Sequence, residues 1–246
     1  MKFSHTLRPT TSPWGKLGLQ VLSCDVTETR MYVKCIDASI QKDIPTGGGI
    51  MGDGGHTIFD TVSPAVSFGT SEIGAGAFYV EGGVWTEACT NLAAFGTSKM
   101  RKVHSGARHE VTDDVYALLT DETKDATDKA LLLQVRDMLR GIFDRAKFDA
   151  QCMRLAGAGE DKMPAAQAVD IITRAARKFT WTEGEREGIL GSLLEGANFT
   201  RYGLHAAVTR YSQNDAVNYD RASELEKLGG DIIDLEPTAW RELVAA

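Results

Sequence analysis

The residues best suited to chemistry form a basic strip between Ala88 and His109. This strip holds four fixed cations and two histidines and no acidic residue. The whole chain has 27 basic and 34 acidic residues, a net charge of −7, so the rest of the molecule carries −11. A local cationic excess on an acidic chain predicts a site for an anionic ligand. The candidate binding residues are Lys99, Arg101, Lys102, His104, Arg108 and His109.

Nucleic acid is one anion that such a strip could bind. Each Lys or Arg can neutralise a phosphate, and the histidines can add hydrogen-bond donors. The alternative is the solvated edge of a sheet, whose cations pair with acidic residues elsewhere in the chain. The binding hypothesis therefore requires cations that stand unpaired at the surface and face outward together. The nearest aromatic residues that could stack on bases are Phe78, Tyr79 and Trp85.

The histidines do not form a recognisable metal motif. Asp53 and His56 are three residues apart, and His104 and His109 are five apart. Neither pair has the i, i+4 spacing on a helix with a nearby acidic partner that a zinc site requires. We therefore expect no metal and no cofactor, and a metal-dependent hydrolase would need all four side chains to converge.

A glycine loop covers residues 45–56, with six glycines in twelve positions. It lacks the Gly-Lys-Ser/Thr of a P-loop and does not match the dinucleotide-binding fingerprint. The chain also has no Gly-x-Ser-x-Gly nucleophile elbow. We expect a flexible surface loop that becomes ordered only when a ligand binds. We also expect a binding protein in preference to an enzyme.

The first hundred residues, which must position the strip, have the pattern of a β-sheet. Leu17–Val26 and Arg30–Asp37 predict an antiparallel hairpin, because apolar and polar residues alternate in the second run and a short polar turn joins the two. Further strands follow, and the glycines between them predict turns, bulges or places where another backbone comes close. These glycines are Gly74, Gly76, Gly82 and Gly83. These strands are expected at Val62–Phe68, Gly76–Val80 and Val84–Thr90.

The pattern becomes helical from about Asp113. Capping residues and apolar residues at three- and four-residue spacings predict five helices followed by one short strand. The first expected helix runs from Thr123 to about Leu155, and the second has Pro164 in its first turn. The third begins at the capping box Thr182–Glu185. The fourth runs from the cap Thr200 through Gln213, and the fifth from the cap Asp220 to Gly229–Gly230. The strand is expected at Ile232–Leu235.

These elements predict an α+β fold, with a glycine-rich antiparallel sheet in the N-terminal half packed with a helical C-terminal half. We expect a β-rich subdomain at 1–110 and a helical subdomain at 111–246 that share one core. The content of 43% apolar and 25% charged residues is that of a globular protein. Without a secretory leader or a long apolar run, a cytoplasmic location without membrane contact is expected. Four scattered cysteines predict mostly buried thiols.

Three blocks of the chain together resemble a known family. They are Ser67–Ala77, then Cys89-Thr90-Asn91 followed by the basic strip, and lastly Arg201–Arg210 with Tyr219–Gly230. Over about Leu17 to Trp240 the chain is similar to the phage/plasmid-like family called domain of unknown function 932. Members usually carry a longer N-terminal region, and Leu92 stands where glycine is expected. The resemblance implies a phage or mobile-element context and supplies no catalytic residues.

The leading hypothesis is a homo-oligomeric, non-catalytic protein of a phage or prophage that binds or anneals single-stranded nucleic acid through the strip. The main rival is a structural or assembly protein in which a basic sheet edge and an acidic helical half meet between copies of the chain. The same opposite charges would serve both functions. A metal-dependent hydrolase is the second alternative.

Overall fold

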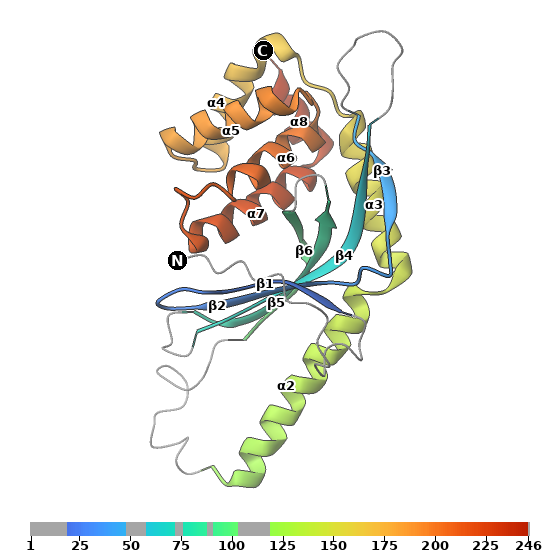
Figure 1. The fold of residues 1–246 in the computed structure, drawn as a ribbon, viewed down its shortest axis with the longest axis vertical. Helices are drawn as coiled ribbons and strands as arrows, with labels where there is room; N and C mark the ends of the chain where they lie inside the picture. The colour runs from blue at the N-terminus through green and yellow to red at the C-terminus, as the bar shows by residue number, and fades with distance from the viewer. Residues whose placement is uncertain (1–18, 48–57, 72–75, 88–90, 103–118, 246) are drawn as a thin grey trace. The chain divides into compact units, whose positions relative to one another are not determined.

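The computed structural model describes residues 19–47, 58–71, 76–87, 91–102 and 119–245. The chain is α+β, as predicted, with its strands in the N-terminal half and its helices in the C-terminal half (Figure 1). The strands are β1 (Gln20–Val26), β2 (Met31–Ile36), β3 (Lys42–Pro45), β4 (Phe59–Thr70), β5 (Phe78–Thr86) and β6 (Asn91–Lys102). The helices are α2 (Asp121–Ile142), α3 (Arg145–Glu160), α4 (Ala168–Lys178), α5 (Glu183–Gly196), α6 (Arg201–Tyr211), α7 (Tyr219–Ile233) and α8 (Pro237–Val244), and a 3₁₀ turn over Ala165–Gln167 precedes α4.

The strands form one sheet in the order β1-β2-β4-β5-β6, and β3 also pairs with β4. The predicted hairpin of β1 and β2 is confirmed, since the two strands are antiparallel with Val26 opposite Met31. The Thr27 amide donates to the carbonyl of Arg30 at 2.8 Å and closes the turn. Strand β2 then pairs antiparallel with β4, where Val33 lies opposite Phe68. The hairpin is thereby joined to the long central strands.

Of the alternatives expected at Gly82 and Gly83, the turn that would separate two strands does not form. Strand β5 runs through both glycines to Thr86, and both are buried. Because β5 lies between β4 and β6, its backbone is hydrogen-bonded on both sides, and these ladders hold the glycines in the extended conformation. A glycine pair interrupts a strand only where the neighbouring strands do not impose this geometry.

Two predicted helix starts are confirmed. Thr182 and Glu185 form a capping box, in which the Glu185 amide donates to Thr182 Oγ1 at 3.3 Å and the Thr182 amide donates to Glu185 Oε2 at 2.8 Å. Thr200 caps α6 by accepting from the amide of Gly203 at 3.0 Å. Both caps satisfy amides that have no partner within the helix.

The single long helix expected from Thr123 to Leu155 is wrong. Helix α2 ends at Ile142, and α3 begins at Arg145. Asp144 accepts from the Lys147 amide at 3.0 Å, so a local cap starts a new helix where apolar spacing alone predicted continuity.

The predicted limits of the fifth helix are also wrong. Helix α7 is capped by Asn218 instead of Asp220 and continues through Gly229 and Gly230 to Ile233, so no strand forms at Ile232–Leu235. A Cβ atom at Gly229 would lie 2.6 Å from Thr209 Cγ2 of α6. Gly229 therefore lets α6 pack closely against α7, and α7 continues past it.

The chain divides into two compact units. Unit 1 comprises Met1–Ile40, Pro64–Gly83 and Thr97–Lys147, and unit 2 comprises Gln41–Ser63, Val84–Gly96 and Phe148–Ala246. Strands β4, β5 and β6 therefore each contribute one end to each unit. The predicted subdomain boundary at 110/111 lies outside the described residues.

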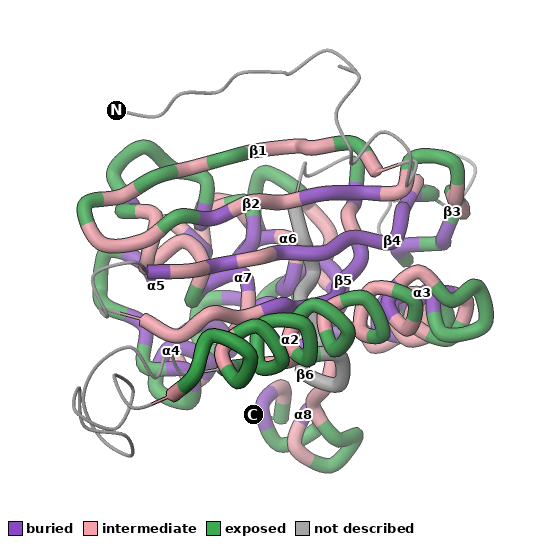
Figure 2. Tube along the Cα trace, turned by 90° about the horizontal axis from the view of Figure 1, so that it is seen from below, coloured by how far each residue is buried: buried purple, intermediate pink, exposed green. Residues whose placement is uncertain are grey.

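The two units have hydrophobic cores of different depth. In unit 2 a large cluster joins α4 to α8, with Ile172, Leu204 and Leu225 fully buried. In unit 1 a smaller cluster joins one face of the sheet to the C-terminal half of α2, where Ile142 is the buried residue of that helix. Figure 2 shows α2 as mainly exposed, in contrast to the buried strand β4.

Candidate functional site

The structure describes only part of the basic strip. Lys99, Arg101 and Lys102 lie in β6, the last strand of the sheet in the described part of the chain. The side chain of Lys102 lies outside the described residues. So do the other candidate residues of the strip and of the metal hypothesis, which are His104, Arg108, His109, Asp53 and His56.

Lys99 and Arg101 project from the same face of β6. Met100, between them, packs against the hydrophobic cluster of unit 1, and successive side chains of a strand point to opposite faces. Both cations therefore lie on the face away from that cluster, and both are exposed. The backbone alternation of one edge strand thus brings two of the six candidate residues together.

Lys99 does not meet the requirement that the cations be unpaired. Its Nζ lies 3.5 Å from Glu81 Oε1 on β5, and the Lys99 side chain keeps 37% of its exposure. The expectation of an entirely unpaired strip is therefore wrong at this position. Glu81 is itself 4% exposed, and ion pairing offsets part of the cost of burying its carboxylate. Among the described residues, no ion-pair partner of Arg101 is found.

The same face of the sheet carries aromatic and basic neighbours. Tyr79 alternates with the core residues Phe78 and Val80 on β5, so it shares the face of Glu81. The Tyr79 ring is half-buried and lies 6.5 Å from that of Tyr32 on β2, at a tilt of 58°. Arg30 Nη1 donates to the Tyr32 hydroxyl at 3.4 Å.

Of the three aromatic residues nearest the strip, Tyr79 is the one that lies within unit 1 on the face of Lys99 and Arg101. Phe78 packs into the hydrophobic cluster of unit 1 on the opposite face, and Trp85 lies on the part of β5 that belongs to unit 2. A face that combines exposed cations with an aromatic ring can attract phosphates and contact bases. The alternation pattern in the sequence was sufficient to find this pairing once β5 and β6 were known to be neighbours.

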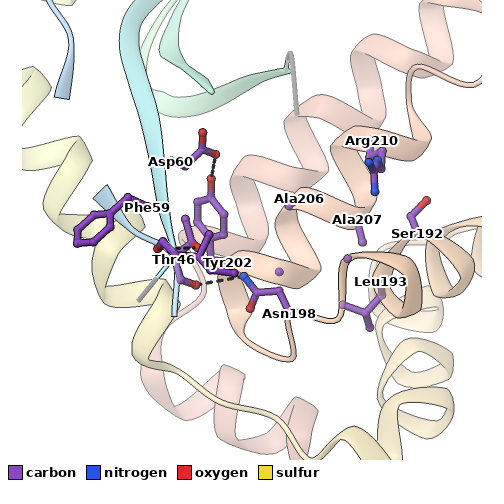
Figure 3. Close-up of a pocket in the computed structure, with 13 residues that line it drawn as sticks. Thr46, Phe59, Asp60, Ser192, Leu193, Asn198, Tyr202, Ala206, Ala207 and Arg210 are labelled. Atoms are coloured by element: carbon purple, nitrogen blue, oxygen red, sulfur yellow. Dashed lines mark hydrogen bonds between the residues drawn. The ribbon is translucent and has the colours of Figure 1, made fainter. Parts of the chain in front are cut away.

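A second polar site lies within unit 2 and was not predicted. A cavity of about 160 Å³ is lined by residues of β4, α5 and α6, among them Asp60, Tyr202 and Arg210 (Figure 3). The Tyr202 hydroxyl donates to Asp60 Oδ2 at 2.5 Å, and both residues are buried. The two residues are 142 positions apart in the sequence, so no local motif announces the pair.

A set of hydrogen bonds fixes one wall of this cavity. The Thr46 amide donates to the Ile58 carbonyl at 2.9 Å, and Asn198 Nδ2 donates to the Thr46 carbonyl at 3.2 Å. Gly47 follows with φ of +69°, and a Cβ atom there would lie 1.7 Å from the carbonyl oxygen of Gly159. Only glycine fits at this contact. Of the glycine loop at 45–56, residues 48–56 lie outside the described part of the chain.

Burial and hydrogen bonding shift the pKa values of three further side chains, outside the strip and the cavity. Burial lowers the pKa of His205 to about 4, and its Nδ1 lies 2.9 Å from the Gly229 carbonyl oxygen. Hydrogen bonds from Arg221, one of them 2.7 Å long, lower the pKa of Glu185 and fasten α5 to α7. Burial raises the pKa of the Cys35 thiol to about 11, which disfavours the reactive thiolate.

Of the four cysteines, Cys35 and Cys152 are buried, whereas Cys24 is exposed and Cys89 lies outside the described residues. Within the described ranges, no group of three or more His, Cys, Asp or Glu side chains is placed to hold a metal ion. No described helix has the length and apolar character needed to cross a bilayer.

Comparisons of the chain with protein-family models, with curated proteins and with solved structures gave no match. The resemblance to domain of unknown function 932 therefore stays a prediction.

Proposed function

We propose that the protein binds single-stranded nucleic acid along β6, without catalysing a reaction, as a self-associating DNA-handling protein of a phage or other mobile element in the host cytoplasm. The observation that carries this proposal is the exposure of Lys99 and Arg101 on one face of an edge strand, on the same side of the sheet as Tyr79. The mobile-element context rests on the family resemblance.

The geometry suits a flexible single strand. Two residues along a β-strand span about 7 Å, close to the separation of successive phosphates in an extended single strand. Lys99 and Arg101 could therefore contact neighbouring phosphates, and the ring of Tyr79 offers a surface for a base. The Lys99–Glu81 pair has a partly exposed cation, so a phosphate can compete with the carboxylate for it.

The test is the salt dependence of binding to a fluorescent oligothymidylate, measured by anisotropy. Each cation that contacts a phosphate contributes about 0.7 to the slope of log K against log salt for a single strand. The double variant Lys99→Gln/Arg101→Gln should lower that slope by about 1.4. Replacing Glu81 by Gln removes the competing carboxylate and should raise the affinity.

The matched control is Arg177→Gln/Lys178→Gln on α4, which removes two exposed cations from unit 2. This variant should leave the slope unchanged. If both double variants lowered the slope equally, the effect would come from net charge alone, and β6 would not be the binding site. The absence of any binding at low salt would overturn the function.

The rival assembly function makes a different prediction in the absence of nucleic acid. A lattice held together by opposite charges should dissociate as salt rises, because salt screens exposed charges. Light scattering of the pure protein between low and high salt measures this directly. If particle size collapses with salt and oligonucleotides do not bind, the charged edge serves assembly and the nucleic-acid proposal fails.

A further inference from the structure

The cavity of unit 2 lies along one face of helix α6 (Figure 3). Its volume is about 160 Å³, and a cavity of about 150 Å³ can hold benzene. Protein interiors contain few voids larger than a water molecule, and an unfilled cavity lowers stability in proportion to its volume. A space of this size is therefore more than a packing defect, and it limits the body of a ligand to about one ring.

The polar groups at the end of the cavity next to β4 are already engaged within the protein. The hydroxyl of Tyr202 donates to Asp60, and both residues are buried. Asn198 uses both atoms of its amide, since Nδ2 donates to the Thr46 carbonyl at 3.2 Å and Oδ1 accepts from the Thr200 hydroxyl at 2.7 Å. This end is thus a wall of the cavity, and the charge that selects a ligand must lie elsewhere.

The middle of the cavity is apolar. Ala206 and Ala207 of α6 line it, together with Leu193 of α5. Ala207 and Leu193 are buried, and the short alanine side chains leave the space that a ligand can fill. Apolar atoms that move from water into such a site bind favourably in proportion to the surface they bury. The middle of the cavity therefore suits the hydrocarbon body of a small ligand.

The far end of the cavity presents a cation. Arg210 follows Ala206 by four residues, so both lie on the same face of α6, one turn apart. The Arg210 side chain is 53% exposed, and its Nη1 lies 3.9 Å from Glu195 Oε2, whose side chain is 77% exposed. Exposed ion pairs of this kind contribute little, so a ligand anion can compete for the guanidinium. Ser192 also lines the cavity and adds a hydroxyl donor.

The charges around the cavity favour a ligand with one negative charge. Among the described residues that line it, Asp60 and Arg210 are the charged ones. With Glu195 already near it, the single guanidinium can balance one further negative charge but not two. Its planar fork matches a carboxylate. The buried Asp60 repels a second carboxylate from the other end, so the ligand must place its charged group at Arg210.

We propose that this cavity binds a small monocarboxylate whose apolar body is no larger than one ring. The carboxylate pairs with Arg210, and the body packs against Ala206 and Ala207. One helical turn rises about 5.4 Å, a distance that a single ring with its carboxylate can span. Benzoate and hexanoate represent the aromatic and the aliphatic form of this chemistry. The cavity shares no residue with the strip on β6, so the inference does not rest on the proposed function.

Nuclear magnetic resonance titration of the full-length protein with benzoate and with benzylamine tests the proposal without any variant. The two compounds have nearly the same shape and opposite charges. Benzoate should bind at least ten-fold more tightly, because its hydrogen bonds to the guanidinium are charge-assisted. A parallel titration with hexanoate shows whether the natural body is a ring or a chain. Tighter binding of benzylamine would mean that Asp60 selects the ligand, and it would overturn the proposal.

Three variants locate the binding site. Arg210→Gln should weaken benzoate binding about ten-fold. Glu195→Gln removes the competing carboxylate and should strengthen binding by up to about five-fold. Both side chains are mainly exposed, so both variants should fold. Ala206→Leu fills the cavity with apolar atoms and should abolish binding although Arg210 is still present. Circular dichroism verifies that this third variant is folded.

The matched controls lie on exposed surface of unit 2. Arg177→Gln on α4 removes a cation, and Ala166→Leu in the 3₁₀ turn adds the same apolar atoms outside the cavity. Both should bind benzoate like the unmodified protein, as should Lys99→Gln/Arg101→Gln. If neither benzoate nor hexanoate bound at millimolar concentration, if benzylamine bound as well as benzoate, or if Arg210→Gln or folded Ala206→Leu bound benzoate unchanged, the proposal would be wrong.

Discussion

The two units of this protein are stabilised in different ways. In unit 2, helices α4 to α8 enclose fully buried aliphatic side chains, and the starts of α5, α6 and α7 are capped by side chains. In unit 1, the hydrophobic cluster lies between one sheet face and the last turns of α2, and Leu132 and Leu133 of that helix are 69% and 41% exposed. The chain therefore concentrates its packing in the unit that also contains the cavity.

This contrast fits the different surroundings of the cavity in unit 2 and of the proposed binding strand β6 in unit 1. A cavity selects its ligand only if its walls hold their positions, and a densely packed helical core provides that rigidity. An exposed strand edge that attracts phosphates acts through charge over longer distances and needs little enclosure. Asp60 and Tyr202 in the cavity of unit 2 are thus buried and hydrogen-bonded, whereas Lys99 and Arg101 on β6 are exposed.

The largest test of the contrast is a pair of leucine truncations. Leu204→Ala in α6 removes a fully buried side chain and should lower the free energy of unfolding by about 2–5 kcal/mol. Leu132→Ala in α2 removes a side chain that is 69% exposed and should change it by less than about 0.5 kcal/mol. Urea unfolding followed by far-ultraviolet circular dichroism reports on the helices of both units. Equal losses would show that α2 is as firmly packed as α6.

The features that could be predicted from the sequence are those that depend on neighbouring residues in the chain. The alternation in Arg30–Asp37 predicted the hairpin, and the spacing of Thr182 and Glu185 predicted where α5 begins, because both signals lie within a few residues of the structure they produce. The basic strip was likewise visible, since it is a continuous run. Its placement on an edge strand depended on the order of strands, which no local pattern encodes.

The features that sequence reasoning missed depend on contacts between distant residues. Gly229 is of the residue type that commonly ends a helix, but it lies within α7. Its lack of a side chain makes room for Thr209 of α6. Glu81 is an ordinary acidic residue until the pairing of β5 and β6 brings it to Lys99. The Asp60–Tyr202 pair joins a strand to a helix that begins far along the chain. Proximity of this kind follows from topology, and periodicity does not reveal it.

A second test uses the only histidine that the described part of the chain places in the helical core. The pKa of His205 is about 4 in the folded protein, below the usual 6.5, because burial disfavours its charged form. The unfolded chain therefore binds more protons between these values, and stability falls as the pH drops from about 6.5 to 4, by about 3 kcal/mol in total. Below pH 4 this contribution is constant.

The measurement compares urea unfolding of the unmodified protein and of His205→Gln at several pH values between 4 and 7. Trp181 and Trp240 are both buried in unit 2, so their fluorescence follows the unfolding of the unit that contains His205. The difference between the two proteins isolates the histidine from carboxylates that titrate in the same range. A difference that does not vary with pH would contradict a neutral, buried imidazole.

The smallest expected effect separates two threonine caps of similar geometry. Thr182 Oγ1 accepts from the Glu185 amide at 3.3 Å, and Thr120 Oγ1 accepts from the Thr123 amide at the same distance. Thr182→Ala should cost about 1 kcal/mol, because the start of α5 is fixed in the core of unit 2 and cannot unravel alone. Thr120→Ala should cost only a few tenths of that, because the first turns of α2 are exposed and can fray without exposing a core.

Hydrogen exchange of the two helices in the native state measures both effects. Replacing Thr182 should speed exchange along the whole of α5, whereas replacing Thr120 should speed it only in the first turn of α2. The hydrogen bonds are of equal length, so a difference in outcome must come from the packing behind them. If both substitutions acted over a whole helix and to the same extent, the first turns of α2 would be as cooperative with their surroundings as α5, and the contrast between the two units would fail there.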